Sequence, residues 1–158
     1  MAASPSGEMM STIQRASGSC FCGSVRFTVT LPSLFCVHCH CSMCRRLQGA
    51  AFVTWFSIPR GQLALETPES GLERYASSDH GSRTSCSGCA SPLFYESEHR
   101  PEQVDVVLAS MQEPIDRSPQ MHVFFDDRAL WTVVDDDLPR LGGVTGLEPI
   151  DVGGDPVS

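Results

Sequence analysis

The sequence predicts an all-β fold of short strands that zinc holds together. Two observations support this fold class. Short apolar runs, some alternating with polar residues, end at prolines or turn-forming residues. Seven of the eight cysteines also fall into three close clusters. The chain has 158 residues, of which 41% are hydrophobic, so it has the size of one domain and can bury a core.

The clearest elements lie in the first half of the chain. Apolar and polar residues alternate over 25–31, which is typical of a strand with one buried face, and a proline ends this run. Residues 51–58 are rich in aromatic and β-branched side chains and predict a second strand. Between these two strands, Arg45–Gln48 predicts one helical turn that stops at Gly49.

The rest of the chain predicts short strands joined by turns. A polar stretch over 77–85 and the pair Asp126–Asp127 are expected to be turns. Residues 1–13 and 142–158 are expected to be flexible tails around a zinc domain that spans 14–141. The remaining strands are expected over residues 62–65, 73–75, 93–95, 104–109, 121–125 and 129–134.

The charge of the chain argues against several classes of function. The formal net charge is −8, and the basic residues are scattered apart from Arg45 and Arg46, so we expect no nucleic-acid partner and no membrane partner. The sequence contains no lysine, which excludes a lysine Schiff base and a P-loop. No apolar run is long enough for a bilayer, and the first dozen residues lack a signal-peptide pattern, so we expect a cytoplasmic protein.

The cysteines point to metal binding. Thiols stay reduced inside cells, so clustered cysteines there indicate metal ligands or catalytic groups. Zinc prefers thiolates in a tetrahedral shell, whereas disulfides within such close pairs would form small, strained rings. Gly88 suits the tight turn of a C-x-x-C motif because glycine tolerates a positive φ. The three clusters are Cys20 with Cys22, then Cys39, Cys41 and Cys44, and finally Cys86 with Cys89.

Seven thiols fill one tetrahedral zinc site and leave three ligands for a second site. A zinc ion with three protein ligands keeps a position for water or substrate, as catalytic sites do. The C-x-C-x-x-C motif is the natural local set of three, and the two distant pairs would then form the closed site. Spacing alone leaves this partition open, because Cys36, His38 or His40 could supply a fourth ligand to the local set and make that site structural too.

Three segments carry a resemblance to a known family. They read G-S-C-F-C-G-S-V-R-F, C-H-C-S-M-C-R-R-L-Q-G-A and C-S-G-C-A-S-P-L, and the segment from Met121 to the D-D-D-L-P motif is also similar. Over about residues 17 to 141 the sequence resembles the glutathione-dependent formaldehyde-activating enzymes, a family that includes centromere protein V. The resemblance implies a β-tent-like fold of several small, twisted antiparallel sheets around zinc.

The resemblance also implies two Zn²⁺ ions per chain and a carbon–sulfur lyase activity. A thiol such as glutathione and an aldehyde such as formaldehyde would be the small-molecule partners, joined as an S-hydroxymethyl adduct. By the same resemblance, the structural zinc would be bound by Cys20, Cys22, Cys86 and Cys89, and the catalytic zinc by Cys39, Cys41 and Cys44.

Further residues are candidates for roles around the open site. A zinc-bound thiol is delivered as a thiolate at neutral pH, and Arg45 or Arg46 could offset the negative charge or hold a substrate carboxylate, although both could also be solvated surface residues. His40 is expected to face away from the metal, because neighbours in an extended segment alternate. His122 is either a general acid or a histidine satisfied within the sheet.

Two other functions stay open at this stage. The chain could be a zinc module that binds another protein without catalysis, or it could use the open zinc for lyase or isomerase chemistry on a different small metabolite. Exposed strand edges could also pair two copies into a homodimer.

Overall fold

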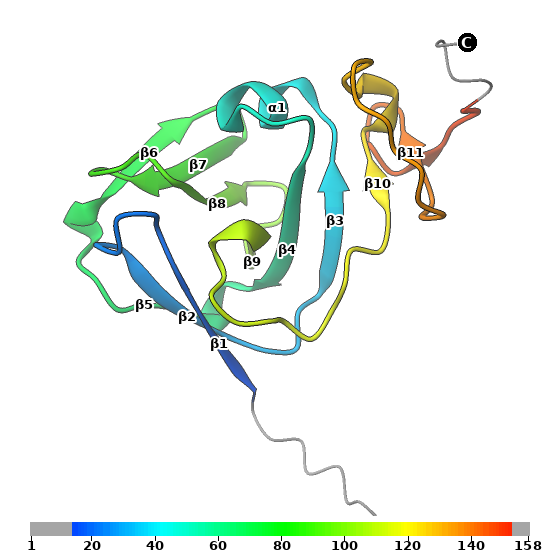
Figure 1. Ribbon diagram of the computed structural model, residues 1–158. Helices are drawn as coiled ribbons and strands as arrows, with labels where there is room; N and C mark the ends of the chain where they lie inside the picture. The colour runs from blue at the N-terminus through cyan, green and yellow to red at the C-terminus, as the bar shows by residue number, and fades with distance from the viewer. Residues whose placement is uncertain (1–13, 153–158) are drawn as a thin grey trace, which may run out of the picture.

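A computed structural model describes residues 14–152 and shows an all-β protein (Figure 1). The expected flexible segments 1–13 and 153–158 lie outside the described residues. Its single α-helix in this range, α1 (Ser42–Gln48), has seven residues. No helix in the described range is long and apolar enough to cross a membrane.

The largest element is a seven-stranded sheet with the order β10-β3-β4-β9-β8-β7-β6. Its neighbouring strands are antiparallel, except that β10 runs parallel to β3. The strands of this sheet are β3 (Phe35–Cys39), β4 (Val53–Pro59), β6 (Leu72–Ala76), β7 (Gly81–Cys86), β8 (Pro92–Ser97), β9 (Gln103–Val107) and β10 (His122–Val123).

Two smaller sheets complete the fold. A three-stranded antiparallel sheet, β1-β2-β5, lies across from β4 and β9 (Figure 1). A two-stranded sheet, β11-β12, follows at the end of the described chain. Their strands are β1 (Arg15–Ser19), β2 (Arg26–Thr30), β5 (Leu63–Leu65), β11 (Leu141–Gly142) and β12 (Glu148–Pro149). Short 3-10 turns are η1 (Arg60–Gln62), η2 (Glu69–Gly71), η3 (Leu108–Ser110) and η4 (Phe125–Asp127).

The all-β prediction is confirmed, and most predicted strands have a counterpart. The predicted strands over 25–31 and 51–58 correspond to β2 and β4, and the shorter ones to β5, β6, β8 and β9. The predicted helical turn is the second half of α1, and Gly49 ends the helix in a left-handed conformation with φ 59°, as a C-cap requires. Strands β1 and β3 were not predicted, because small and polar residues or cysteines interrupt their apolar pattern.

Four predicted segments differ from the structure in type or extent. Residues 77–85 were expected to be a turn, yet most of them form β7, because partners on both sides satisfy the backbone of this polar segment. Residues 129–134 form no strand, and Val133 is 87% exposed there. Only two residues of the strand expected over 121–125 pair, as β10. Within 142–152, expected to be flexible, the structure places most of the small β11-β12 sheet.

The core lies on both faces of the seven-stranded sheet. On one face Phe56 and Ile58 of β4 pack with the apolar residues of β2. On the other face Trp55 packs with Val53, Val107 and two cysteines, Cys39 and Cys44. Successive side chains of a strand point to opposite faces, so β4 takes part in both clusters. The second cluster places the end of β3 and helix α1 on one face of the sheet.

Candidate metal centres

The four-cysteine cluster consists of Cys20, Cys22, Cys86 and Cys89. Their sulfur atoms all lie within 4.8 Å of one another. The first pair sits in the turn that joins β1 to β2, and the second pair lies at the end of β7 and in the turn that leads to β8. Pairing within two different sheets therefore brings together two cysteine pairs that are more than sixty residues apart.

Backbone amides aim at the sulfurs of the four-cysteine cluster. The amide of Val25 donates to the Cys20 sulfur at 3.2 Å, and the amide of Gly88 donates to the Cys86 sulfur at 3.3 Å. Burial raises the pKa of Cys20, but the bond from the Val25 amide and the neighbouring side chains of Cys22, Ser24 and Cys86 lower it to about 7. The hydroxyl of Ser91, 3.1 Å from the Cys89 sulfur, leads the groups that lower the pKa of Cys89 to about 5. These groups favour thiolates, the form that a metal binds.

The C-x-x-C turn obtains its left-handed residue from an unexpected position. Gly88 was expected to supply a positive φ, but the residue with φ 62° is Ala90, just after the motif. A methyl group at position 88 would lie 3.7 Å from the Cys86 sulfur, which is ordinary van der Waals contact. The expectation for Gly88 is therefore wrong, and the turn is closed by the bond from the Ala90 amide to the Cys86 carbonyl at 2.9 Å.

The four sulfurs fit a tetrahedral zinc ion. Zinc–sulfur bonds of about 2.3 Å place neighbouring sulfurs of a tetrahedron about 3.8 Å apart. The Cys20 and Cys22 sulfurs are 3.5 Å apart, and the Cys22 and Cys86 sulfurs are 3.8 Å apart. All eight cysteines of the chain are free thiols in the structure. The spacing therefore matches a four-thiolate site.

The three-cysteine cluster consists of Cys39, Cys41 and Cys44, again with all sulfurs within 4.8 Å. Cys39 ends β3, Cys41 caps the N-terminus of α1, and Cys44 lies in its first turn. The amide of Cys44 donates to the Cys41 sulfur at 3.3 Å, so the helix cap itself fixes the spacing of two thiols. Cys39 and Cys44 are buried and Cys41 is half-buried.

An arginine from β7, near the other edge of the seven-stranded sheet, reaches the three-cysteine cluster. The Arg83 Nη2 donates to the Cys44 sulfur at 3.5 Å, and its Nε donates to the Ser77 hydroxyl at 3.2 Å. Its guanidinium lies over Tyr95, 5.1 Å from the ring centre, and 5.8 Å from that of Trp55. Its Nη1 is buried without a hydrogen-bond partner among the described residues.

Arg83 also shapes the electrostatics of the cluster. Hydrogen bonds from Cys39 and Cys41 lower the pKa of Cys44, and the charge of Arg83 lowers it further, against the effect of burial. The pKa of Cys39 is raised, first by its hydrogen bonds to the other two cysteines. Without a metal ion, the cluster therefore favours a thiolate at Cys44 and a protonated thiol at Cys39.

Arg45, expected beside the open site, makes different contacts. Its Nε donates to the His40 carbonyl at 3.2 Å, and its Nη2 donates to the Asp127 carbonyl at 2.9 Å. These bonds tie α1 to the preceding segment and to η4. The catalytic role expected of Arg45 stays a prediction, and Arg46 is exposed on the same helix.

The candidates for a fourth ligand lie away from the three sulfurs. Cys36 is fully buried in the other core cluster, because it points to the opposite face of β3 from Cys39. Burial raises its pKa to about 11. Neither His38 nor His40 belongs to the group of atoms within 4.8 Å of one another at the three-cysteine cluster. Among the described residues, the cluster thus offers three ligands.

His40 instead joins a buried chain of hydrogen bonds. Its Nε2 lies 2.8 Å from the His122 Nδ1, and the His122 Nε2 lies 2.9 Å from the Asp136 carboxylate. A carboxylate only accepts, so it fixes the proton of His122 on Nε2, and His40 then donates to the bare Nδ1 of His122. His122 is 1% exposed. The structure therefore favours the histidine satisfied within the fold over the general acid.

Sequence reasoning did not single out Arg83 or Asp136. Arg83 lies in the polar stretch expected to be a turn, and only its pairing with Tyr95 across β7 and β8 reveals its position. Asp136 lies in a run of three aspartates expected to be a solvated turn, and its side chain is 42% exposed. No sequence pattern separates it from its neighbours.

Fold and clusters together define a small all-β protein with two cysteine centres able to hold metal ions. Comparison with known proteins then identifies the family: the profile described as "Glutathione-dependent formaldehyde-activating enzyme" matches residues 15–127. The chain belongs to this family. The matched range contains all seven clustered cysteines and Arg83, whereas Asp136 lies beyond it.

One curated relative carries the name of this family, and one solved structure shares the fold. A Halomonas elongata protein named "Putative glutathione-dependent formaldehyde-activating enzyme" is 29% identical over 125 residues, which cover 75% of this chain and 80% of the relative. A crystal structure of a Rhodobacter sphaeroides protein is 24% identical, with a TM-score of 0.54, and covers 64% of this chain and 92% of its own. That structure shares the fold.

Proposed function

We propose that the chain is a zinc-dependent enzyme that joins a thiol, such as glutathione, to an aldehyde, such as formaldehyde. The reverse reaction cleaves the same carbon–sulfur bond, as a lyase does. The observation that carries the proposal is the unequal pair of cysteine clusters, with four thiols in one and three in the other. Family membership and the name of the Halomonas relative support the substrate classes.

Each cluster has the donor set for one Zn²⁺ ion. The four-cysteine cluster would hold a structural ion, because four thiolates complete a tetrahedral shell. The three-cysteine cluster would hold the catalytic ion and leave room for one more ligand. When bound there, zinc lowers the pKa of a coordinated thiol and makes a thiolate available at neutral pH.

The reaction needs no oxidant or reductant. The thiol gives up its proton, and its sulfur attacks the carbonyl carbon with an electron pair. The new carbon–sulfur bond forms as the carbonyl π pair moves onto oxygen, and this oxygen takes up a proton. The product is an S-hydroxymethyl thioether when the aldehyde is formaldehyde. Thiolate formation and orientation are therefore the steps that the protein has to assist.

We assign to Arg83 the role that sequence analysis gave to Arg45. Three thiolates place excess negative charge at the cluster, and the guanidinium of Arg83 offsets it by contacting the Cys44 sulfur. Arg83 also lines a pocket of about 180 Å³ together with Trp55 and Tyr75. A carboxylate at one end of the thiol would pair with the guanidinium of Arg83 from this pocket. Arg45 would position α1 through its bonds to His40 and Asp127.

The first experiment measures zinc per chain for the reduced protein and for Cys44→Ser. We expect two zinc ions in the parent and about one in the variant, with the thermal unfolding transition retained. Exchange NMR of formaldehyde with glutathione should show a rate above the uncatalysed one only for the parent. A variant that keeps both ions, or a parent that does not accelerate exchange when loaded with two ions, would contradict the proposal.

A further inference from the structure

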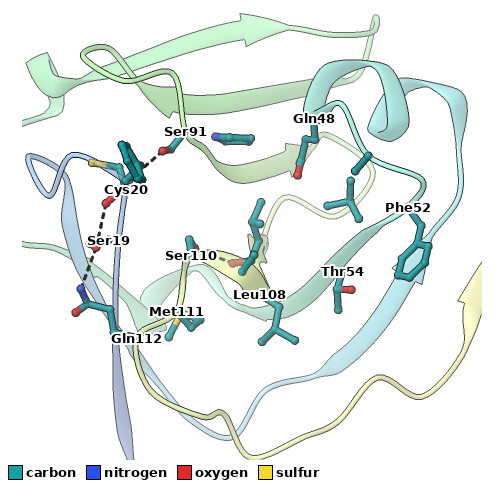
Figure 2. Close-up of a pocket in the computed structure, with 16 residues that line it drawn as sticks. Ser19, Cys20, Gln48, Phe52, Thr54, Ser91, Leu108, Ser110, Met111 and Gln112 are labelled. Carbon is teal, nitrogen blue, oxygen red and sulfur yellow. Dashed lines mark hydrogen bonds between the residues drawn. The ribbon is translucent and has the colours of Figure 1, made fainter.

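A large pocket among the described residues is lined by no Asp, Glu, Arg or His side chain and is in this sense uncharged, although Cys20 of the four-cysteine cluster is one of its lining residues. Sixteen residues line it, and its volume is about 770 Å³ (Figure 2). It lies between the β1–β2 turn, the start of β8, the end of α1, β4 and η3. The chain as a whole has a net charge of −8, so an uncharged cavity of this size is a distinct local feature.

Most polar groups of this uncharged pocket are already paired. The Gln112 side chain donates to the Ser19 hydroxyl at 3.0 Å, and Ser110 donates to the Val107 carbonyl at 2.7 Å. Ser91 accepts from the Phe21 amide at 2.9 Å. The Thr54 hydroxyl likewise lies 2.8 Å from the His38 ring nitrogen.

Gln48 is the exception among these polar groups. No described residue hydrogen-bonds its side-chain amide, and Figure 2 shows this side chain extending from the end of α1 toward the pocket. An amide can donate and accept, so it can serve a carbonyl, hydroxyl or ether group of a ligand.

The remaining walls favour an uncharged, apolar ligand. A carboxylate placed there would lose hydration without gaining a positive counter-charge, and a thiolate at Cys20 would repel it, so its binding is unfavourable. An apolar group gains from leaving water, and pockets of this size hold drug-sized molecules. The main apolar residues of the wall are Phe21, Phe52, Val53, Val107, Leu108 and Met111.

The uncharged pocket lies near the three-cysteine cluster, although none of its three cysteines lines the pocket. Gln48 follows Cys44 by four residues in α1, so the two side chains lie on one face of the helix about 6 Å apart along its axis. Val53, which lines the pocket, packs in the same core cluster as Cys39 and Cys44. Gln48 also lines the smaller pocket beside Arg83. It therefore stands between an uncharged pocket and a cationic one.

We propose that the uncharged pocket holds the organic group of an uncharged aldehyde that is much larger than formaldehyde. Gln48 hydrogen-bonds this group, and the thiol lies on the side of Arg83. Formaldehyde has two heavy atoms and fills only a small part of the pocket. The assignment of the ligand as an aldehyde rests on the proposed function, whereas the preference for an uncharged ligand rests on the pocket alone.

The test separates binding from catalysis. Calorimetry and ligand-observed NMR at pH 8 compare 4-methylbenzyl alcohol with 4-(hydroxymethyl)benzoate, which have similar shapes but differ in charge. We expect the neutral alcohol to bind at least about tenfold more tightly than the carboxylate. Equal affinities, or no binding of the neutral alcohol, would overturn the proposal whether or not the protein is an enzyme.

Two charge-adding variants locate the site. Gln48→Lys should narrow the preference for the neutral alcohol by about tenfold, because it places a cation at the pocket. Val144→Lys adds the same charge at a site that is 95% exposed and far along the chain, and it should leave the preference unchanged. Identical behaviour of the two variants would refute binding in this pocket.

The matched aldehydes then test the substrate assignment. With glutathione present, 4-methylbenzaldehyde should react with a larger enzymatic acceleration than 4-carboxybenzaldehyde, and Gln48→Lys should reduce that difference. If formaldehyde is accelerated but the pair shows no difference, the pocket assignment fails and the proposed function stands. If the neutral alcohol binds but no aldehyde is accelerated, the proposed function fails and the pocket remains a binding site for uncharged molecules.

Discussion

The two cysteine clusters use the same side chain in two different structural settings. The four-cysteine cluster joins turns from two sheets, whereas the three-cysteine cluster is built from one short segment where β3 passes into α1. The first links parts of the chain that are far apart in sequence. The second is local, since a helix cap and one buried face already bring its thiols together.

This difference predicts unequal contributions to stability and catalysis. A cross-link between distant segments restricts the unfolded chain more than a local one, because loop-closure entropy grows with the length of the loop. The local cluster also has a charged neighbour in Arg83, whereas the distant cluster has backbone amides and serine hydroxyls around its sulfurs. We therefore expect the four-cysteine cluster to govern folding and the three-cysteine cluster to govern chemistry.

The largest expected effect is the loss of folding when Cys86 is replaced by serine. Cys86 is 1% exposed and accepts bonds from two amides of its turn, so the variant loses a metal ligand and the sulfur around which this turn is arranged. Structural zinc sites contribute about 10 kcal/mol or more of apparent binding free energy to folding. Circular dichroism melting should show no cooperative transition near that of the parent. A variant with the parent's melting temperature and metal content would reverse the roles of the two clusters.

The next effect concerns the charge beside the three-cysteine cluster. Arg83→Gln removes a cation that contacts the Cys44 sulfur, and a charge-assisted hydrogen bond contributes about 1.5–3 kcal/mol, so catalysis should fall about 10- to 100-fold. Arg83→Lys should restore part of the rate, because lysine restores the positive charge but not the several donor nitrogens of the guanidinium. Steady-state kinetics with glutathione tests both variants. Arg45→Gln is the control for this comparison, and a larger loss there than at Arg83 would favour Arg45 as the catalytic arginine.

The local cluster could be predicted from the sequence, but its electrostatic partner could not. The C-x-C-x-x-C spacing and the alternation of strand side chains place the three cysteines on one side, and this requires no tertiary information. Arg83 reaches them only because β7 pairs between β6 and β8, and β7 consists of polar residues that favour turns. Pairing with neighbours overrode local propensity there, so reasoning from propensity missed both the strand and the arginine.

The end of the chain shows the opposite error. Residues 129–134 have the apolar content of a strand, yet Trp131 is 74% exposed and no sheet edge pairs with them. The nearby Asp136 owes its role to the parallel pairing of β10 with β3, which stacks His122 beside His38. Parallel pairing joins segments that are distant in sequence, so no local sequence pattern predicts it.

A smaller effect is expected at the buried hydrogen-bond chain. Asp136→Ala leaves the ring nitrogen of His122 buried without an acceptor, which should cost about 1–3 kcal/mol of the free energy of unfolding. Asp136→Asn keeps an acceptor oxygen and should cost less. Urea unfolding at pH 7 measures both, and equal losses would show that the carboxylate does not act through His122.

The pH dependence sharpens this test. Partial burial raises the pKa of Asp136, but the Leu138 amide and His122 lower it more, so its net pKa in the folded protein lies below the ordinary value. A carboxyl with a lowered folded pKa contributes stability above its unfolded pKa and loses it as the pH falls through the folded pKa. The difference between the parent and Asp136→Ala should therefore shrink below about pH 4. A difference that stays the same from pH 7 down to the pH at which the protein unfolds in acid would point to packing instead.

The smallest effect is expected for the one cysteine outside both clusters. Cys36 is fully buried among apolar side chains, and burial raises its pKa to about 11, so at pH 8 only about one molecule in a thousand carries its thiolate. Cys36→Ala should keep both zinc ions and cost about 1 kcal/mol through a small cavity. Elemental analysis of zinc and urea unfolding of Cys36→Ala check these two expectations. Loss of a zinc ion in Cys36→Ala would make Cys36 the fourth ligand, and the distinction between a closed and an open cluster would then disappear.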